Sequence, residues 1–244
     1  MIGKLKRHLQ RQQFNPGFLG IFMNPHYLMR RAIYKVMREQ VPNLNGKILD
    51  IGCGVKPYQQ LFVNTSSYTG MEFDSNEQRE KSQAEIFYDG KKFPFKNKTF
   101  DSIIFTEVLE HIFNPDEFLS EVNRVLKTNG TILLSTPFIW YEHSHPYDYG
   151  RYSSFGLKHI LEKHGFEITV QQKLVSDISV IFQLVTGYIY TKISWIKSYK
   201  IKLILYVVLI SPWTVLGIIV AKILPKSTDI YLDNFVIAKK YARK

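Results

Sequence analysis

Cysteine is nearly absent from this sequence: Cys53 is the only one among 244 residues. A single cysteine excludes an internal disulfide, so no oxidising compartment is required and a cytoplasmic setting is expected. We find no internal repeat, and no secretory signal is expected because Asn24-Pro25 interrupts the apolar residues 18–23. Hydrophobic residues make up 45% of the chain and charged residues 22%. These values exclude a disordered or collagen-like chain, and the length suits one sizeable domain with additions.

Acidic residues are scarce at both ends of the chain, although the formal net charge is +11 overall. Residues 1–40 contain Glu39 as their single acid, beside Lys4, Lys6, Arg7, Arg11, Arg30, Arg31, Lys35 and Arg38. Residues 178–228 contain six lysines and no acid. Basic flanks could bind nucleic acid, anionic lipid or a phosphorylated substrate. Because they contain no recognisable nucleic-acid module, we do not expect nucleic acid to be a partner.

Short apolar runs alternate with segments of helical periodicity from residue 46 onward, which predicts an α/β fold with a parallel sheet. The apolar runs predict strands at 47–51, 67–72, 85–88, 102–106, 131–136 and 166–171. Helices are expected over 26–40, from an N-cap at Asn114 to Gly130, and between Ser153 and Gly165.

A glycine turn, Asp50-Ile-Gly-Cys-Gly54, follows the first expected strand and precedes an expected helix. Glycines let a ligand approach the backbone, and a helix N-terminus would add positive charge. The third glycine of the dinucleotide fingerprint is missing, because Val55-Lys56-Pro57 follow, and this counts against a nicotinamide or flavin cofactor. Taken alone, the motif is also compatible with an ordinary tight turn.

Acids recur at the ends of the next strands. Glu72 lies eighteen residues after Gly54, and its carboxylate could accept hydrogen bonds from both hydroxyls of a ribose. Asp89 follows the third strand and could accept the amino group of an adenine. One such acid is often a solvated turn residue, but the regular recurrence indicates a site for an adenosyl cofactor.

Four stretches in order resemble the class I S-adenosylmethionine-dependent methyltransferases: ILDIGCG (48–54), YTGMEFD (68–74), residues 93–137 and residues 145–167. The resemblance implies a Rossmann-like sheet with helices on both faces and an antiparallel last strand, for which residues 234–240 are the candidate. It also implies S-adenosyl-L-methionine as cofactor. The implied cofactor-binding residues are Asp50, Gly52, Gly54, Glu72, Asp89, Gly90 and Thr106. Lys56 stands where many relatives have the third glycine.

Glu107, Glu110 and His111 follow the fourth expected strand. On a helix they would share one face, and two carboxylates with an imidazole could hold a divalent cation, for which Mg²⁺ is the expected ion. The same pattern binds a metal in similar quinone-precursor O-methyltransferases. Alternatively, His111 packs against the cofactor and the glutamates are caps.

The segment 140–152 (WYEHSHPYDYGRY) follows the fifth expected strand and is dense in aromatic and polar side chains. We expect it to bind a hydroxyl-rich acceptor, with His111 or His145 as the general base. Its candidate substrate-binding residues are His143, Tyr147, Asp148, Arg151 and Tyr152. Alternatively, Asp148 and Arg151 pair only to hold the loop. Similar HPYDYxRYS sequences occur in methyltransferases linked to polysaccharide or lipid-linked glycan synthesis, which implies such an acceptor.

Nineteen consecutive uncharged residues, 203–221, are long enough to cross a bilayer as a helix. However, Pro212 interrupts them, and a single crossing would separate residues 234–240 from the sheet. We therefore expect an interfacial or re-entrant helical hairpin on the inner face of the membrane, with lysines at anionic headgroups. A buried subdomain or a dimer interface would also explain the pattern.

The expected organisation is a basic helical segment (1–45), a methyltransferase core (46–175), an apolar membrane-associating insertion (176–228) and a last strand with a basic tail (229–244). The expected function is O-methylation of a glycan or lipid-linked acceptor. Two alternatives stay open, a quinone-precursor O-methyltransferase and a non-catalytic binding protein with this fold. The sequence leaves the oligomeric state open.

Overall fold

The computed structural model describes residues 12–241, so the basic residues Lys4, Lys6, Arg7 and Arg11 lie outside the described part. The chain divides into two compact units. One unit contains the residues up to Val36 together with Ile139–Tyr141 and Lys173–Asp233. The other contains Met37–Phe138, Glu142–Gln172 and the residues from Asn234 onward.

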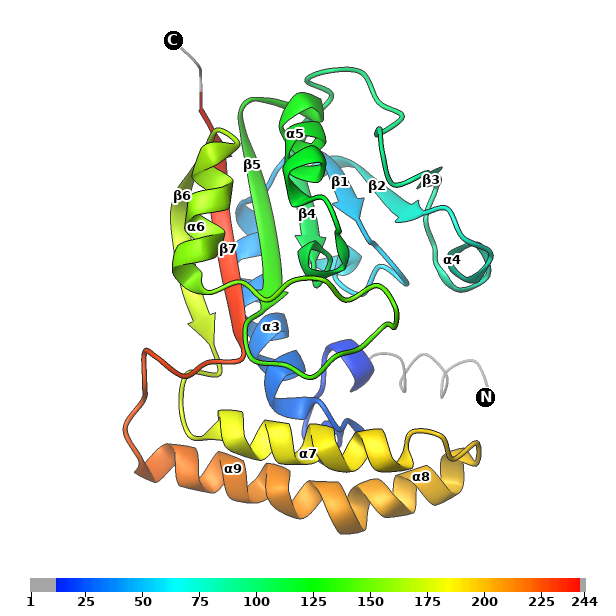
Figure 1. Cartoon of the computed structure of the whole chain (residues 1–244), viewed down its shortest axis with the longest axis vertical. Helices are drawn as coiled ribbons and strands as arrows, with labels where there is room; N and C mark the ends of the chain where they lie inside the picture. Colours follow the sequence, from blue (N-terminus) through cyan, green and yellow to red (C-terminus); the bar gives the residue numbers. More distant parts are fainter. Residues whose placement is uncertain (1–11, 242–244) are drawn as a thin grey trace. The chain divides into compact units, whose positions relative to one another are not determined.

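A seven-stranded sheet dominates the second unit (Figure 1). Its strands follow the order β3-β2-β1-β4-β5-β7-β6. Their bounds are β1 (Gly46–Ile51), β2 (Thr65–Phe73), β3 (Ile86–Tyr88), β4 (Phe100–Thr106), β5 (Leu126–Pro137), β6 (Phe166–Leu174) and β7 (Asp233–Lys240). The first five strands pair in parallel. β7 runs antiparallel to β6, since Thr169 and Tyr241 donate hydrogen bonds to the carbonyls of Ile237 and Gly165. The expected α/β fold with an antiparallel last strand is therefore confirmed.

The central strands β1, β4, β5 and β7 contain long runs of residues that are buried on both faces, as their apolar sequences require. One face packs against α5 (Pro115–Val125) and α6 (Ser154–Lys163), which lie in front of the sheet in Figure 1. α5 contributes a buried stripe to this core, namely Phe118, Leu119, Val122 and Val125. Ile48, Ile104 and Leu133 alternate with the residues of this face and are fully buried too.

Three local expectations were wrong. α5 ends at Val125 instead of Gly130, because β5 begins at Leu126 and the residues up to Gly130 belong to this strand. The Asn114 side chain makes no capping hydrogen bond, although Pro115 does occupy the first turn of α5. No α-helix follows the glycine turn directly. After Lys56, which has a positive φ of 53°, and Pro57, the chain forms only the 3-10 turn η2 (Gln59–Leu61).

Two further short helices belong to the sheet unit, α4 (Asn76–Lys81) and the 3-10 turn η1 (Val41–Asn43). The expected helix over 26–40 is present as α3 (Tyr27–Gln40). Ser153 caps α6 as expected, because its hydroxyl accepts a hydrogen bond from the Gly156 amide.

The other unit is helical and contains α2 (Gly20–Met23), the first part of α3, α7 (Ser179–Ile193), α8 (Tyr199–Leu205), the π-helical turn η4 (Tyr206–Ile210) and α9 (Ser211–Ile223). α8, η4 and α9 form one continuous helix that lies beside α7 (Figure 1). Pro212 does not break it, because Pro212 sits at the start of α9 directly after the π turn. There the Ser211 amide bonds to the Tyr206 carbonyl. Gly217 allows close packing on α7, since a Cβ there would lie 2.8 Å from Phe182 Cβ.

The continuous helix Tyr199–Ile223 is long and apolar enough, by length and composition, to cross a membrane, and no other helix among residues 12–241 is. It has 25 residues, and its most apolar stretch of 18 residues has a mean hydropathy of 2.5, yet only 22% of that stretch is buried. Its exposed apolar residues include Ile204, Val208, Leu209, Trp213, Leu216 and Ile219. An exposed apolar surface of this kind is typical of an interaction site.

Candidate active site

The glycine turn at the end of β1 has two glycines with positive φ, each required for a different reason. Gly52 (φ 67°) packs so closely that an added Cβ would lie 2.4 Å from a methyl group of Val108. Gly54 (φ 48°) borders open space, with nothing within 4 Å of an added Cβ. The turn is therefore closed on one side by packing and open at Gly54, where a ligand could approach the backbone.

Glu72, at the end of β2, is held directly beside this turn. The Gly54 amide donates a 2.8 Å hydrogen bond to Glu72 Oε1, and the Phe73 amide donates one of 3.2 Å to Oε2. Burial raises the pKa of Glu72, and these two amide donors oppose that rise. The structure thus brings together Gly54 and Glu72, as an adenosyl site requires.

Asp50 is buried in β1 instead of lying at the open edge of the turn. The Tyr68 hydroxyl donates a short hydrogen bond to its carboxyl group. Burial raises the pKa of Asp50 to about 7, although the Tyr68 hydrogen bond acts in the opposite direction. Tyr68 was not among the predicted site residues; its place on β2, two residues before Gly70, was the one signal available in the sequence.

Lys56 takes the left-handed conformation that glycine normally takes, so the turn keeps its shape without a third glycine. Its buried ammonium group forms an ion pair with Glu85, whose other oxygen accepts a 2.7 Å hydrogen bond from the Gly70 amide. Burial of Glu85 opposes ionisation, but Lys56 and the Gly70 amide lower its pKa. This ion pair was not predicted from the sequence, because Lys56 and Glu85 are far apart in it.

The remaining predicted cofactor residues lie at the same edge of the sheet, because β3, β2, β1 and β4 are neighbours and their carboxyl ends coincide. Asp89 and Gly90 follow β3 and are exposed. Asp89 Oδ1 accepts a 3.0 Å hydrogen bond from the Lys91 amide. Thr106 is the last residue of β4 and is half-buried.

Glu107 does not share a helical face with Glu110 and His111, contrary to expectation. It has a positive φ of 56° and directly follows the last residue of β4, and only Leu109–His111 form a 3-10 turn, η3. Glu107 Oε1 instead accepts a 2.6 Å hydrogen bond from the Ser135 hydroxyl on β5. Glu107 has a left-handed backbone conformation and turns the chain before η3 begins. The helical face expected to present Glu107, Glu110 and His111 together is therefore not formed.

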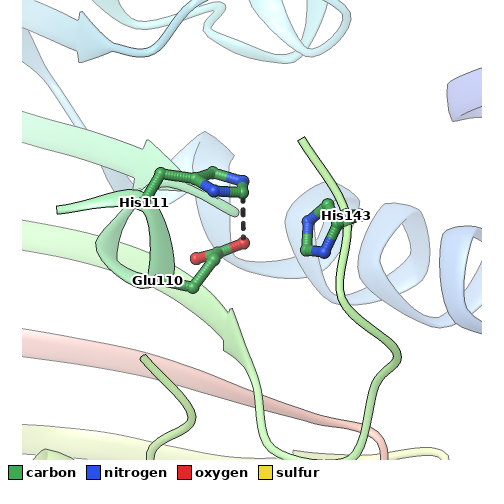
Figure 2. A group of neighbouring side chains, drawn as sticks. All are labelled: Glu110, His111 and His143. Atoms are coloured by element: carbon green, nitrogen blue, oxygen red, sulfur yellow. Dashed lines mark ion pairs between the residues drawn. The ribbon is translucent and has the colours of Figure 1, made fainter. Parts of the chain in front are cut away.

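Glu110, His111 and His143 do come together, with one potential ligand atom from each lying within 4.8 Å of the others (Figure 2). Glu110 is fully buried. Its Oε2 accepts a 3.2 Å hydrogen bond from Thr136, whereas its Oε1 accepts none and lies 3.8 Å from His111 Nε2. Burial, aided by the nearby Glu107 carboxylate, raises the pKa of Glu110 well above its usual value. The two imidazole rings pack edge to face with centroids 4.8 Å apart.

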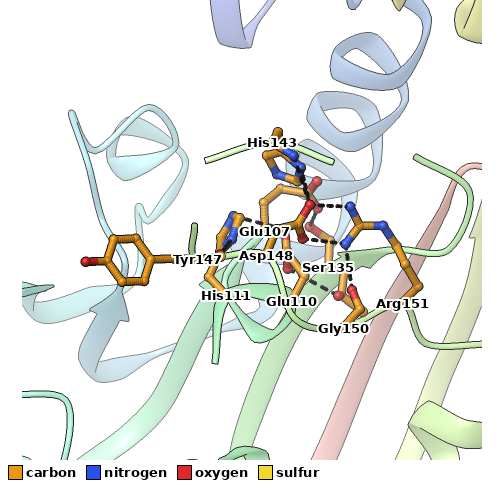
Figure 3. Close-up of polar contacts among 10 residues, drawn as sticks. Glu107, Glu110, His111, Ser135, His143, Tyr147, Asp148, Gly150 and Arg151 are labelled. Carbon is orange, nitrogen blue, oxygen red and sulfur yellow. Dashed lines mark hydrogen bonds and ion pairs between the residues drawn. The ribbon is translucent and has the colours of Figure 1, made fainter. Parts of the chain in front are cut away.

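The loop after β5 is held by an ion pair between Asp148 and Arg151 (Figure 3). Arg151 donates two hydrogen bonds of 2.6 Å to the two Asp148 oxygens, and the His143 amide donates a third of 2.9 Å. Burial would raise the pKa of Asp148, but these donors lower it to about 2. The pairing of Asp148 with Arg151 that was weighed as an alternative is therefore present, and substrate binding by these residues stays a prediction. The backbone amides of Tyr149 and Gly150 also hold the loop, because both donate a hydrogen bond to the Glu110 carbonyl.

The other candidates of this loop are placed differently. His145 and Tyr147 are exposed, so His145 is not part of the imidazole and carboxylate cluster. Tyr152 is half-buried, and its carbonyl accepts a 2.7 Å hydrogen bond from Asn234 on β7. Of the two histidines considered as a base, only His111 lies beside a buried carboxylate.

Comparisons with known proteins agree with this arrangement. A profile described as a methyltransferase domain matches residues 24–171. The uncharacterized protein MJ0638 of Methanocaldococcus jannaschii is 25% identical over 121 residues, which make up 49% of this chain and 53% of that protein. The chain thus matches about half the length of this relative.

Two solved structures share the fold. An S-adenosylmethionine-dependent methyltransferase from Mesorhizobium loti has a TM-score of 0.51 at 13% identity, covering 87% of this chain and all of that one. Phosphoethanolamine N-methyltransferase 2 of Haemonchus contortus, in complex with S-adenosyl-L-methionine, has a TM-score of 0.51 at 18% identity, covering 92% of this chain and 56% of that one. The profile match spans more than half of the chain, which therefore belongs to the methyltransferase domain family.

Proposed function

We propose that this protein is an S-adenosylmethionine-dependent methyltransferase. The observation that carries the proposal is the hydrogen bond from the Gly54 amide to Glu72, which places a carboxylate beside a glycine turn that is open to a ligand. A ribose diol would bind the Glu72 carboxylate, and Asp89 at the neighbouring strand end would accept the adenine amino group. The solved relative in complex with S-adenosyl-L-methionine supports this cofactor.

Methyl transfer is an in-line displacement at a sulfonium carbon, so the protein must mainly align the acceptor, the methyl group and the sulfur. A neutral hydroxyl is a weak nucleophile and needs a base. His111 is the best placed candidate, because its ring lies between the buried Glu110 and the loop that follows β5. Glu110 Oε1, 3.8 Å from His111 Nε2, could stabilise the imidazolium that results.

We further propose that the acceptor is a hydroxyl of a glycan or lipid-linked molecule. The loop after β5 presents the exposed Tyr147 and Tyr149 next to this cluster, and aromatic rings of this kind stack well on sugar faces. The resemblance of residues 145–153 to methyltransferases of polysaccharide synthesis supports the same acceptor class.

The apolar helices would attach the protein to a membrane surface. Leu232 donates a hydrogen bond to the Leu174 carbonyl, so the two strands that lead into and out of the helical insertion are joined at its base. A single crossing is incompatible with this connection, and α7 with 15 residues is too short for a second crossing. An interfacial position fits best, with Lys192, Lys200 and Lys222 at anionic headgroups. The inner face of the membrane is the proposed location.

Calorimetry with S-adenosylmethionine and S-adenosylhomocysteine would test the cofactor assignment. Glu72→Gln should weaken binding roughly tenfold or more, because a hydrogen bond to a charged group contributes about 1.5–3 kcal/mol. Glu80→Gln, at an exposed acid of α4, is the matched control and should bind as the wild type does. Tight binding of NAD, or no binding of either adenosyl compound, would contradict the proposal. The acceptor would be sought in lipid extracts of cells with and without the protein, as a mass difference of one CH₂ group.

A further inference from the structure

We propose that Glu110, His111 and His143 form a site for a transition-metal ion of the Zn²⁺ type, in place of the Mg²⁺ site expected from Glu107, Glu110 and His111. The three side chains converge from two segments, η3 and the loop after β5 (Figure 2). Two imidazole nitrogens and one carboxylate oxygen are typical of borderline cations, whereas Mg²⁺ prefers oxygen ligands.

One oxygen of Glu110 has no hydrogen bond, which points to a ligand. Its side chain is fully buried, and Oε1 accepts no hydrogen bond, although buried polar atoms almost always have a partner. Thr136 holds the other oxygen, which leaves Oε1 directed toward His111 Nε2 at 3.8 Å. A cation between them would satisfy Oε1 and remove the cost of a buried acceptor that has no hydrogen bond.

Both histidines are oriented by their second ring nitrogen. His111 Nδ1 contacts the Tyr147 carbonyl, which favours the tautomer with a lone pair on Nε2. His143 Nδ1 lies 3.3 Å from Asp148 Oδ2, a carboxylate that Arg151 fixes with two hydrogen bonds (Figure 3). A backbone carbonyl or a carboxylate on the outer nitrogen is the arrangement by which proteins orient metal-binding histidines.

The spacing needs a modest adjustment. Ligand atoms bound to one tetrahedral ion at about 2.0–2.1 Å would lie about 3.3 Å apart, so side chains now within 4.8 Å must close by about 1–1.5 Å. His143 is half-buried on the loop after β5, and closure requires its side chain to turn toward Glu110 and His111. Three protein ligands leave a fourth position for water or an acceptor oxygen, where the ion would act as a Lewis acid.

Metal binding can be measured without methyl transfer. An ion on His111 Nε2 would occupy the nitrogen proposed above as the general base, so with the ion bound the Lewis acid would activate the acceptor hydroxyl in place of His111. The full-length protein, freed of metal with a chelator, would be titrated with Co²⁺ while its visible d–d absorption is recorded, and with Zn²⁺ by calorimetry. We expect one ion at this site, and His143→Ala should lower the affinity tenfold or more. His159→Ala, an exposed histidine on α6, is the matched control and should leave the affinity unchanged.

Further variants distinguish the two ligand sets. Glu110→Gln should also weaken Co²⁺ binding, whereas Glu107→Gln should not, and excess Mg²⁺ should not displace Co²⁺. Circular dichroism and S-adenosylhomocysteine binding would verify that each variant is folded, and His143→Gln provides a second, milder change on the loop. The proposal is overturned if the folded wild type binds neither Co²⁺ nor Zn²⁺. It is also overturned if His143→Ala binds Co²⁺ like the wild type, or if Glu107→Gln and Mg²⁺ competition show an oxygen-ligand site instead.

Discussion

Leu209 and Ile210 are neighbours in the long apolar helix, yet Leu209 is 40% exposed and Ile210 is 1% exposed. This contrast separates the surface of the helical unit from its core at adjacent positions. Two substitutions of the same kind can therefore test membrane attachment and core packing separately.

Leu209→Asp should release the protein from vesicles containing anionic lipid while leaving it folded, because the exposed side chain would face the lipid. Membrane attachment of the wild type should survive high salt, since burial of apolar surface contributes about 25 cal/mol per Å² and is not screened. Flotation of the protein with vesicles measures the effect. A wild type that never floats, or a Leu209→Asp variant that floats equally well, would contradict the membrane proposal.

Ile210→Asp should instead unfold the helical unit, since an unpaired carboxylate would be buried in its core. Circular dichroism and urea unfolding would show a loss of helix or a large drop in the free energy of unfolding. If Ile210→Asp stayed folded and only lost vesicle binding, both residues would face lipid, and the packing of this helix described above would be wrong.

Gly52→Ala should cost considerably more stability than Gly54→Ala. Both positions have positive φ, which costs a residue with a Cβ about 1–2 kcal/mol. At Gly52 the new methyl group would also collide with Val108, whereas at Gly54 it would enter open space. Urea denaturation measures this difference. At Gly54 the methyl group should mainly lower the affinity for the cofactor. If Gly52→Ala and Gly54→Ala were equally stable and bound the cofactor equally well, the turn would not be open at Gly54.

Arg151→Lys should loosen the loop after β5, because lysine cannot form the paired hydrogen bonds that Arg151 makes with Asp148. Loss of a hydrogen bond to a charged, buried group costs about 1.5–3 kcal/mol. The pKa of Asp148 is lowered to about 2, so the contribution of the pair should be present above pH 4 and lost as the pH falls toward 2. Limited proteolysis within residues 140–152, compared across pH, would reveal the opening. If Arg151→Lys were cleaved like the wild type, the backbone hydrogen bonds to the Glu110 carbonyl would be sufficient to hold the loop.

Asp50 should make the protein less stable as the pH rises from about 4 to about 7. The folded protein keeps this carboxyl protonated up to a pKa of about 7, whereas the unfolded chain releases the proton near 3.8, so the unfolded state binds fewer protons in this window. Asp50→Asn should flatten this part of the stability profile. Tyr68→Phe removes the hydrogen bond that lowers the pKa and should extend the decline to higher pH. Urea unfolding at several pH values provides the measurement, and a profile unaffected by Asp50→Asn would exclude this role.

Much of the sheet unit could be predicted from the sequence because its signals are local. Buried strands appear as short apolar runs, glycines mark the turn after β1, and acids at successive strand ends need no knowledge of distant contacts. Parallel strands then bring those ends to one edge of the sheet by topology alone. Residues 234–240 could be placed as the last strand for a similar reason, through their resemblance to the family pattern.

What the sequence alone determined was therefore the order of the strands along the chain, the glycine turn at Gly54 with the acid Glu72 at the next strand end, and the presence of one long apolar segment. Only the tertiary structure decided which side chains meet: Lys56 with Glu85, Tyr68 with Asp50, and His143 with Glu110 and His111. It also decided that Glu107 lies outside the helical turn that contains Glu110 and His111, because Glu107 itself has a left-handed backbone conformation, and that Pro212 follows a π turn without breaking the helix. Such pairings depend on backbone conformation and on contacts between segments far apart in the chain, and no local pattern of residues encodes either.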